Sequence, residues 1–392
     1  MQKKILLKVG GRKHLGECRW IDALDAFDEI YCACIYREDS WENVDDRIHI
    51  IELKKNLLNH FLTGIILKTR NIKFLTFLNW LIILLLRLFN ISWLMKIKNS
   101  FPDFALCSYG DYDRSDLTFL IAKPVIKCQI VRAYKETRVG FNFLEYQTLK
   151  SINKYVFYAE ELREFLEKKY GDKLFLNKNI KYGLDENALS SHILNQIKFE
   201  KKLSSYTEKR HIVILSYRVD SAPNRDRDQG RYYYIETIKE LINAGLIVHL
   251  HCARYNNYNG QNEYEKLKEK YPNEFFMEDV LNMNRDSSAE EWVKSCEILS
   301  KYDFGLMHNI MENSSVSEFD KINVPHRLFA YEAAHVIPII REGQNKVLER
   351  MFCNEKCGIV YQNLIELSKT NMTNLNYYTP SYKSYLAEIQ KW

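Results

Sequence analysis

An arginine-rich stretch in the second half of the chain is the first candidate for a ligand-binding site. Residues 218–231 read RVDSAPNRDRDQGR and contain four arginines and a glycine. Guanidinium groups match phosphate oxygens, and a glycine lets the backbone approach a ligand closely. The stretch therefore predicts a diphosphate-binding loop around Arg218, Arg225, Arg227 and Gly230. The alternative is a solvated loop whose Arg and Asp residues neutralise one another.

A second cluster follows at residues 323–340, NVPHRLFAYEAAHVIPII. We predict a short helix at 327–335 that leads into an apolar strand at 336–341. Arg327 would then meet phosphate at the mouth of the strand. Tyr331 or Glu332 would meet sugar hydroxyls, since a carboxylate accepts paired hydroxyl hydrogen bonds well. The alternative is an ordinary surface pair between Arg327 and Glu332, whose spacing is close to i,i+4.

The elements that would position these clusters form an alternation of apolar runs and amphipathic stretches. Strand and helix in strict turn predict right-handed crossovers and parallel sheets. Ligands bind such sheets beyond the carboxyl ends of the strands, where helix N-termini offer free N–H groups. Predicted strands are 4–9, 30–35, 48–53, 104–108, 125–131, 155–158, 211–217, 246–253, 275–278, 304–308, 336–341 and 358–361, and predicted helices include 141–151, 160–170, 232–243, 263–271, 289–300 and 327–335.

The length of the chain indicates two domains. Its 392 residues, 46% hydrophobic and 27% charged, are too many for one ordinary core. The alternation lapses in the polar stretch 190–210 and restarts at residue 211. We expect an α/β protein with two doubly wound domains, 1–205 and 206–375. A C-terminal helix at 376–392 is expected to return to the first domain.

Composition excludes several classes of protein. The net charge of +5 is spread too evenly for a nucleic-acid-binding face, and the chain contains neither GxxxxGK[ST] nor GxGxxG. The nine cysteines are scattered without partners at zinc-ligand spacing, which favours a reduced cytoplasm and no metal. The first apolar run is too short for a secretory signal.

One apolar segment, residues 74–95, reads FLTFLNWLIILLLRLFNISWLM. It is nearly long enough to span a bilayer, but Asn79, Arg87 and Asn90 interrupt it. Basic flanks and two tryptophans are typical of a helix lying in an anionic membrane interface. An interface helix or helical hairpin, a buried core helix and a true span are the three alternatives. The whole membrane-directed segment is 68–98, and its basic residues outside the run are Lys68, Arg70, Lys73, Lys96 and Lys98.

The run PHRLFAYEAAHVIPII resembles the signature of GT-B glycosyltransferases close to glycosyltransferase family 4, which binds a nucleotide sugar. Further resemblances occur in the same order. IKYGLD at 180–185 is similar to the family's I-P-N-G-x-D turn. Arg218 with Arg225 or Arg227 before Gly230 resembles its diphosphate-holding pair. KYDFGLMH, which ends at His308, resembles the strand preceding its donor site.

The first half shows weaker similarities to the same family. The family's P-D-hydrophobic motif corresponds to residues 101–104, and its K-P-V motif corresponds to residues 123–125. Its Gly-rich loop corresponds to the loop with Gly10 and Gly11. The chain departs from the family at the paired glutamates, because the partner position of Glu332 is Val324 and that of Tyr331 is Asn323. The family glycine before the last proline is replaced by Val336 or His335, and residues 132–134 (RAY) replace a His-Asp step.

The resemblance implies two Rossmann-like domains facing a cleft, the first binding an acceptor and the second a nucleotide sugar. It implies transfer of a sugar from a nucleoside-diphosphate sugar, with retention and without a metal, because fixed arginines stabilise the departing diphosphate. The acceptor would be a saccharide or lipid-linked molecule in bacterial surface polysaccharide, lipopolysaccharide or glycoconjugate synthesis. Expected roles are catalysis for Arg218, Arg227 and Arg327, donor binding for Arg225, Gly230, His308, Tyr331 and Glu332, and the acceptor side of the cleft for Gly10, Gly11 and His14.

Two other functions fit the same architecture. The broken glutamate pair favours a catalytically inactive scaffold or binding subunit. A nucleotide-sugar epimerase would need no acceptor and no membrane segment. For the transferase we expect a cytoplasmic protein with peripheral contact to the inner face of the cytoplasmic membrane, a nucleotide sugar as its ligand and no nucleic-acid partner.

Overall fold

The computed structural model divides the chain into two compact units, Met1–His192 with Ser381–Trp392, and Ile193–Pro380. The structure describes residues 4–8, 28–35, 46–53, 56–100, 105–108, 114–125, 128–131, 140–182, 189, 191–222, 232–257, 262–283, 287–307 and 321–369. The terminal helix predicted at 376–392 lies outside these residues.

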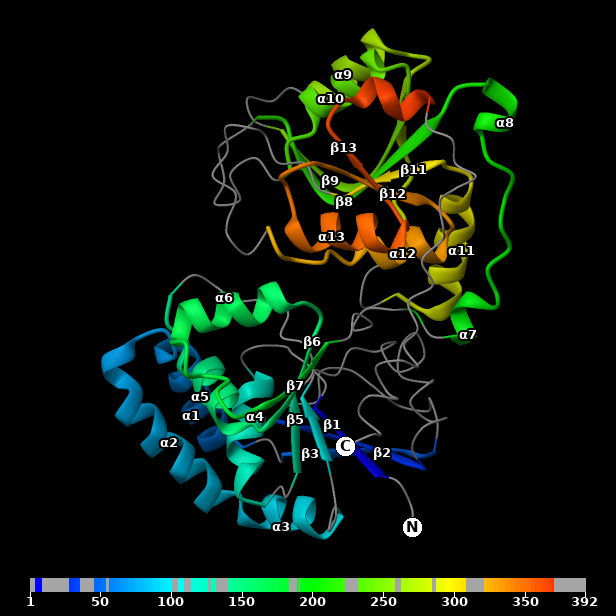
Figure 1. Cartoon of the computed structure of the whole chain (residues 1–392). Helices are drawn as coiled ribbons and strands as arrows, with labels where there is room; N and C mark the ends of the chain where they lie inside the picture. The colour runs from blue at the N-terminus through cyan, green and yellow to red at the C-terminus, as the bar shows by residue number, and fades with distance from the viewer. Residues whose placement is uncertain are drawn as a thin grey trace. The chain divides into compact units, whose positions relative to one another are not determined.

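The first unit is built on a parallel seven-stranded sheet of order β3-β2-β1-β4-β5-β6-β7 (Figure 1). Its strands are β1 (Lys4–Lys8), β2 (Glu29–Cys34), β3 (Ile48–Glu52), β4 (Ala105–Ser108), β5 (Cys128–Val131), β6 (Lys154–Phe157) and β7 (Asn179–Tyr182). Its helices are α1 (Leu57–Thr69), η3 (Lys73–Leu75), α2 (Thr76–Phe89), α3 (Ile91–Ser100), α4 (Arg114–Ala122), η4 (Lys123–Val125), α5 (Phe143–Ser151) and α6 (Glu160–Tyr170).

The second unit contains a parallel six-stranded sheet of order β10-β9-β8-β11-β12-β13. Its strands are β8 (His211–Asp220), β9 (Ile247–Asn256), β10 (Phe275–Glu278), β11 (Phe304–Leu306), β12 (Ile337–Arg341) and β13 (Ile359–Tyr361). The helices from the boundary onward are α7 (Ser191–Leu194), α8 (Ser204–Thr207), α9 (Ile235–Asn243), α10 (Glu263–Lys270), α11 (Ala289–Ser300), α12 (Arg327–Ala333), α13 (Lys346–Glu355) and η6 (Leu364–Lys369).

Both sheets confirm the predicted Rossmann-like fold class. In each, the first strand lies inside the sheet, the next two extend to one side, and the later strands extend to the other. The order therefore reverses between β1 and β4, and again between β8 and β11. Such a reversal places a crevice at the carboxyl ends of the two strands, which is where ligands bind open α/β sheets.

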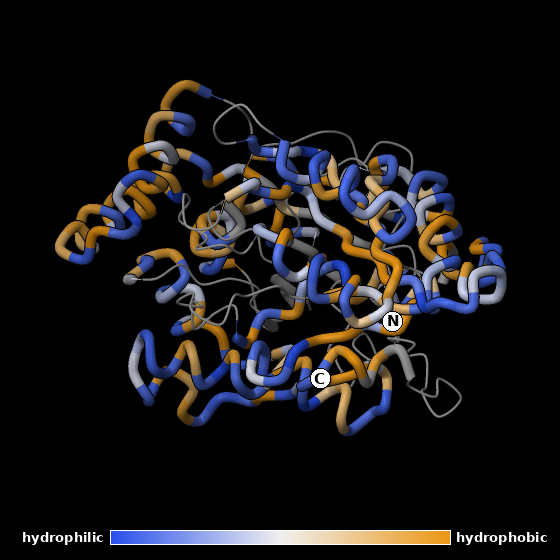
Figure 2. The backbone as a smooth tube through the Cα atoms, turned by 90° about the horizontal axis from the view of Figure 1, so that it is seen from above, coloured by the Kyte–Doolittle hydropathy of each residue, from blue (hydrophilic) through white to orange (hydrophobic). Residues whose placement is uncertain are grey.

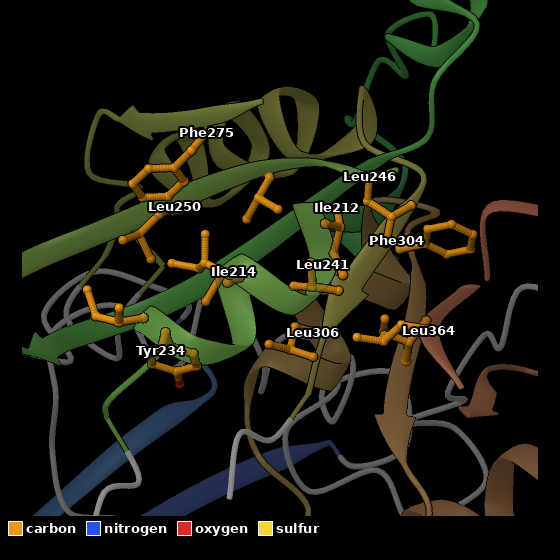
Figure 3. Close-up of a cluster of buried hydrophobic side chains, with 14 of the residues drawn as sticks. Ile212, Ile214, Tyr234, Leu241, Leu246, Leu250, Phe275, Phe304, Leu306 and Leu364 are labelled. Atoms are coloured by element: carbon orange, nitrogen blue, oxygen red, sulfur yellow. The ribbon is translucent and has the colours of Figure 1, made fainter. Parts of the chain in front are cut away.

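The core of the second unit explains why its elements form where they do. Apolar side chains of β8, β9 and β11, including Ile212, Leu250 and Leu306, pack against Leu241 of α9 (Figure 3). Gly245 has a φ of 86° just after α9, in the left-handed region that the predicted C-cap requires. The same cluster contains Tyr234, the N-cap residue of α9, so the core fixes the start of this helix.

The boundary between the units precedes the one predicted at residue 205. The segment after α7 is tied to the second unit, because Leu203 N donates to Lys301 O at 2.8 Å. The Lys202 ammonium donates to Tyr302 O at 2.6 Å and to His335 O at 2.8 Å. Burial lowers the pKa of Lys202 to about 8. A polar composition alone gave no sign of these anchoring hydrogen bonds.

Several element bounds also differ from those predicted. β8 continues three residues beyond Tyr217, because its pairing with β9 extends to Asp220 opposite Asn256. Residues 179–182 form the strand β7, whereas the family resemblance indicated a turn beginning at Ile180. The helix α13 was not among the predicted helices, although Asn345 caps it by accepting a hydrogen bond from Leu348 N at 2.9 Å.

The apolar segment 74–95 folds as two helices, α2 and α3, rather than one. No single helix of the described residues is long and apolar enough to cross a membrane, whereas Lys73–Phe89 and Ile91–Ser100 together meet that requirement as a pair bent by 74°. Ile82, Ile83 and Leu86 are buried within the unit. The segment thus combines a core-facing side with an exposed one.

Candidate functional site

The candidate site begins at the reversal point of the second sheet, where β8 and β11 diverge. β11 pairs with β8 only at Ile212 and Val213 among the described residues, while β8 continues beside β9. The buried Tyr331 hydroxyl accepts a hydrogen bond from Leu215 N at 3.1 Å and lies 3.2 Å from Leu306 O. Tyr331 therefore bridges the two diverging strands.

Tyr331 also requires a glycine on the neighbouring strand. A Cβ atom at Gly305 would lie 2.6 Å from the Tyr331 ring, which is closer than side-chain atoms approach. Burial raises the pKa of Tyr331 above its ordinary value, so the hydroxyl stays protonated. The residue is a fixed part of the sheet, and its hydroxyl is committed to backbone groups.

Arg327 lies one turn before Tyr331 on α12 and is partly buried. Its Nη1 donates to the Tyr234 hydroxyl at 3.3 Å. Within the described part of the chain no carboxylate is paired with its guanidinium. Burial works to lower the pKa of Arg327, but the neighbouring Tyr234 and Tyr331 outweigh it, and the pKa is raised. Arg327 is therefore a positive charge that Tyr234 holds in place and that no carboxylate of the described residues neutralises, which suits it to binding an anion.

Arg218 lies near the end of β8 and not in the following loop. Its guanidinium carbon is 4.2 Å from the centre of the Tyr232 ring, and Nη2 is 3.8 Å from an oxygen of Asp220. The side chain is one-quarter exposed. Stacking on an aromatic ring orients a guanidinium group.

The two arginines meet the same short segment, the tyrosine run 232–234. Arg218 stacks on Tyr232, Arg327 donates to Tyr234, and Tyr232 is also close enough to contribute to the raised pKa of Arg327. This segment leads into α9, whose N-cap makes no side-chain hydrogen bond to the first turn. Two cations and a helix N-terminus at the end of β8 are an arrangement that suits a phosphate group.

Glu332 lies on a different side of α12. The residue is 4% exposed, neither carboxylate oxygen has a hydrogen-bond partner among the described residues, and Cys357 and Glu355 interact with it electrostatically. Burial first, and Glu355 second, raise the pKa of Glu332 well above its ordinary value. Arg327 and Glu332 do not form the alternative surface pair, because Glu332 is buried and no ion pair joins the two among the described residues. The sugar-binding role of Glu332 stays a prediction.

The remaining predicted site residues lie outside the described residues. These are Arg225, Arg227, Gly230 and His308 on the donor side, and Gly10, Gly11 and His14 on the acceptor side. The described residues contain no group of His, Cys, Asp and Glu that could hold a metal ion. His335 has a φ of 51°, in the left-handed region that favours glycine.

Sequence reasoning missed the tyrosine run. Tyr232 and Tyr234 connect both arginines, yet consecutive aromatic residues at a predicted helix start were read as part of the helix alone. A usable signal was present, because three tyrosines directly follow an arginine- and glycine-containing loop. Aromatic rings and phenol hydroxyls at that point can position guanidinium groups.

No protein-family model and no curated protein sequence matches the chain. Its structure is similar to that of trehalose-6-phosphate from E. coli bound with UDP-2-fluoro glucose (TM-score 0.53, 10% identity, covering 99% of this chain and 95% of that chain). It is also similar to α,α-trehalose-phosphate synthase (UDP-forming) from Burkholderia vietnamiensis (0.49, 9%, 99% and 95%) and to a UDP-N-acetylglucosamine 2-epimerase (0.47, 9%, 99% and 95%). The first similarity, with the two parallel sheets, shows the GT-B fold.

Proposed function

We propose that the protein is a glycosyltransferase that takes a sugar from a nucleoside-diphosphate sugar and transfers it to a saccharide or lipid-linked acceptor. The observation that carries the proposal is Arg327. A positive charge that is fixed by Tyr234 and lacks a described carboxylate partner, at the reversal point of a Rossmann-like sheet, suits a phosphate-containing ligand. The E. coli structure of the same fold holds UDP-2-fluoro glucose, which supports a UDP sugar as the donor class.

The chemistry asks mainly for stabilisation of the leaving group. Transfer breaks the bond between the anomeric carbon and a diphosphate oxygen, and it forms a bond from that carbon to the acceptor hydroxyl oxygen, which loses its proton. Negative charge develops on the departing diphosphate. Arg218 and Arg327 would stabilise this charge, because preorganised cations need little rearrangement during the reaction. Arg227 would join them from the loop after β8, and no metal is required for this role.

The finer features of the proposal rest on the family resemblance. A member similar to glycosyltransferase family 4 would retain the anomeric configuration. It would act in bacterial surface polysaccharide, lipopolysaccharide or glycoconjugate synthesis. We propose a cytoplasmic enzyme for this reason, with its acceptor side formed by the first unit.

A thermal-shift screen tests the donor class. Because a ligand that binds only the folded state raises the melting temperature, UDP, GDP and UDP-glucose are compared with ATP and NAD. A ligand at about 100 times its Kd adds about 2.7 kcal/mol of stability, which is a shift of several degrees. We expect UDP or GDP compounds to give that shift. Equal shifts from ATP and NAD, or none from any nucleotide sugar, would contradict the proposal.

A donor-binding subunit without transferase activity is the second candidate. It is favoured by the hydrogen bonds that commit the Tyr331 hydroxyl to backbone groups of the sheet, and by the burial of Glu332 without a hydrogen-bond partner among the described residues. Incubation with radiolabelled UDP sugars and lipid extract separates the two functions. Release of UDP with labelled product supports the transferase, and binding without release supports the subunit.

A further inference from the structure

The first unit carries an exposed apolar surface on α1, η3 and α2. Of the 20 large hydrophobic residues that are exposed in the described structure, 13 lie between residues 57 and 95. Phe77, Leu81, Leu84 and Leu88 follow one another at helical spacing along α2 and are 80%, 45%, 48% and 63% exposed. Spacings of four, three and four residues put side chains on one helix face. We call these four residues, with Phe61 of α1 and Phe74 of η3, the outer apolar face.

Several polar side chains of the same helices point inward. Asn79 of α2 is fully buried and accepts a hydrogen bond from the Thr69 hydroxyl at 2.7 Å. Asn59 and Asn90 exchange reciprocal amide hydrogen bonds of 2.9 and 2.8 Å. Arg87 Nε donates to Leu120 O at 3.2 Å. A helix on the surface of a globular protein has the opposite arrangement, with apolar residues inside and polar residues outside.

The packing of the unit holds this surface outward. α4 packs against β1 and β2, α2 packs on α4, and α1 packs on α2, so α1 and α2 form a layer beyond the helices that cover the sheet. Figure 1 shows α1 and α2 at the edge of the first unit, and in Figure 2 the helices at the corresponding edge are largely hydrophobic. Ile82 and Ile83 occupy the inner side of α2, so α2 cannot turn over without losing its core contacts.

The charged residues of the segment that carries the outer apolar face have one sign. No Asp or Glu occurs between Glu52 and Asp103. Lys68, Lys73, Lys96 and Lys98 are exposed on or beside the same helices. A two-fold pair of chains would bring these lysines together without a compensating acid from the same surface, which opposes self-association through it. Apolar residues bordered by uncompensated lysines suit an anionic lipid headgroup layer.

We propose that the outer apolar face binds the surface of an anionic lipid bilayer. α2 lies in the plane of the interface, with Phe77, Leu81, Leu84 and Leu88 among the upper acyl chains and the four lysines at the headgroup phosphates. The buried inner side of α2 stays packed on α4, so the helix lies on the membrane and does not span it. This proposal does not depend on the donor site.

A flotation assay with the full-length chain tests the proposal. Vesicles of phosphatidylcholine with phosphatidylglycerol should carry the wild-type protein upward, whereas phosphatidylcholine alone should carry much less. The double variant Phe77→Ser/Leu81→Ser removes two exposed side chains and should reduce the partition coefficient about tenfold or more. Leu176→Ser changes another exposed leucine of the same unit, 62% exposed and outside the outer apolar face, and should leave binding unchanged.

The lysines provide an independent arm of the experiment. Lys73→Gln/Lys96→Gln should weaken binding to anionic vesicles about tenfold and make the remaining binding less sensitive to salt. Melting temperatures report folding, and all three variants should melt close to the wild type because the altered side chains are exposed. Equal flotation of wild type and Phe77→Ser/Leu81→Ser would overturn the proposal. So would a wild-type dimer in sedimentation that this variant converts to monomer without any vesicle binding.

Discussion

Arg327 and Tyr234 meet across the second sheet, with the guanidinium Nη1 3.3 Å from the phenol oxygen. Tyr234 belongs to the core cluster and starts α9, while Arg327 starts α12. The hydrogen bond therefore joins the two helices that flank the reversal point of the sheet. The neutral phenol orients the guanidinium group but does not neutralise its positive charge. The charge is therefore held in place and suits an anion.

The first prediction concerns Arg327→Met, which keeps the apolar stem and removes the charge. We expect the free protein to melt close to the wild type, because the charge has no described carboxylate partner to lose. Affinity for UDP or UDP-glucose should fall about 10- to 100-fold, because a hydrogen bond to a charged group contributes about 1.5–3 kcal/mol. Isothermal titration calorimetry measures this change. Lys266→Met, which removes an exposed charge on α10, is the matched control and should bind like the wild type. An early-melting Arg327→Met would instead show a structural role.

The second prediction concerns the Tyr331 hydroxyl. Tyr331→Phe leaves the Leu215 N–H, which now donates to this hydroxyl, without its partner at the point where β8 leaves β11. We expect a loss of about 1–3 kcal/mol in the free energy of unfolding, the cost of an unsatisfied buried polar group. Urea denaturation measures it. Tyr217→Phe, at a side chain 75% exposed, should change stability by less than about 0.5 kcal/mol. Similar effects of the two substitutions would mean that the Tyr331 hydroxyl does not join the strands.

The third prediction tests the close approach of Gly305 to Tyr331. Gly305→Ala puts a methyl group 2.6 Å from the ring and should cost about 1–3 kcal/mol. In a Tyr331→Ala background the same substitution should cost much less, because the ring is gone. Gly64→Ala, where a Cβ meets nothing within 4 Å inside α1, should stabilise by about 0.5–1 kcal/mol. Additive effects of Gly305→Ala and Tyr331→Ala would show that the two residues do not compete for space.

The sequence was informative about the fold because strict alternation of apolar runs and amphipathic stretches leaves few topologies other than parallel sheets. The end of β8 was not predictable in the same way. Arg218 and Asp220 are charged, and it is their pairing opposite Arg254 and Asn256 of β9 that keeps them in a strand. Pairing between strands distant in sequence is invisible to local pattern.

Side-chain direction was the least predictable feature. In α12 every residue from Leu328 to Ala333 is buried, so no polar face distinguishes the side of Tyr331 from the side of Glu332. In α2 the sides are distinct but contradict the usual rule, because the polar Asn79 is buried and the apolar Phe77 is exposed. Periodicity identifies which residues share a face, but it does not tell which face is covered when both contain apolar residues.

The last prediction concerns the pH dependence of stability at Glu332. Because its pKa is raised in the folded state, the folded protein holds a proton that the unfolded chain releases above about pH 4.5. Glu332 therefore destabilises the fold progressively as pH rises above that value, until the folded protein also releases the proton. Glu332→Gln, which imitates the protonated acid, should be more stable than the wild type at pH 8 and should lose this advantage towards pH 4.5.

Chemical denaturation across this pH range measures the difference, and Glu290→Gln, at an exposed site in the first turn of α11, is the control that should show no such trend. A variant less stable than the wild type at pH 8 would mean that the ionised carboxylate has a stabilising partner. Titration of the same variant with UDP-glucose addresses the sugar-binding prediction separately. Weaker binding by a stable Glu332→Gln protein would place the carboxyl group at the ligand, whereas unchanged binding would assign it to the buried interior of the second unit.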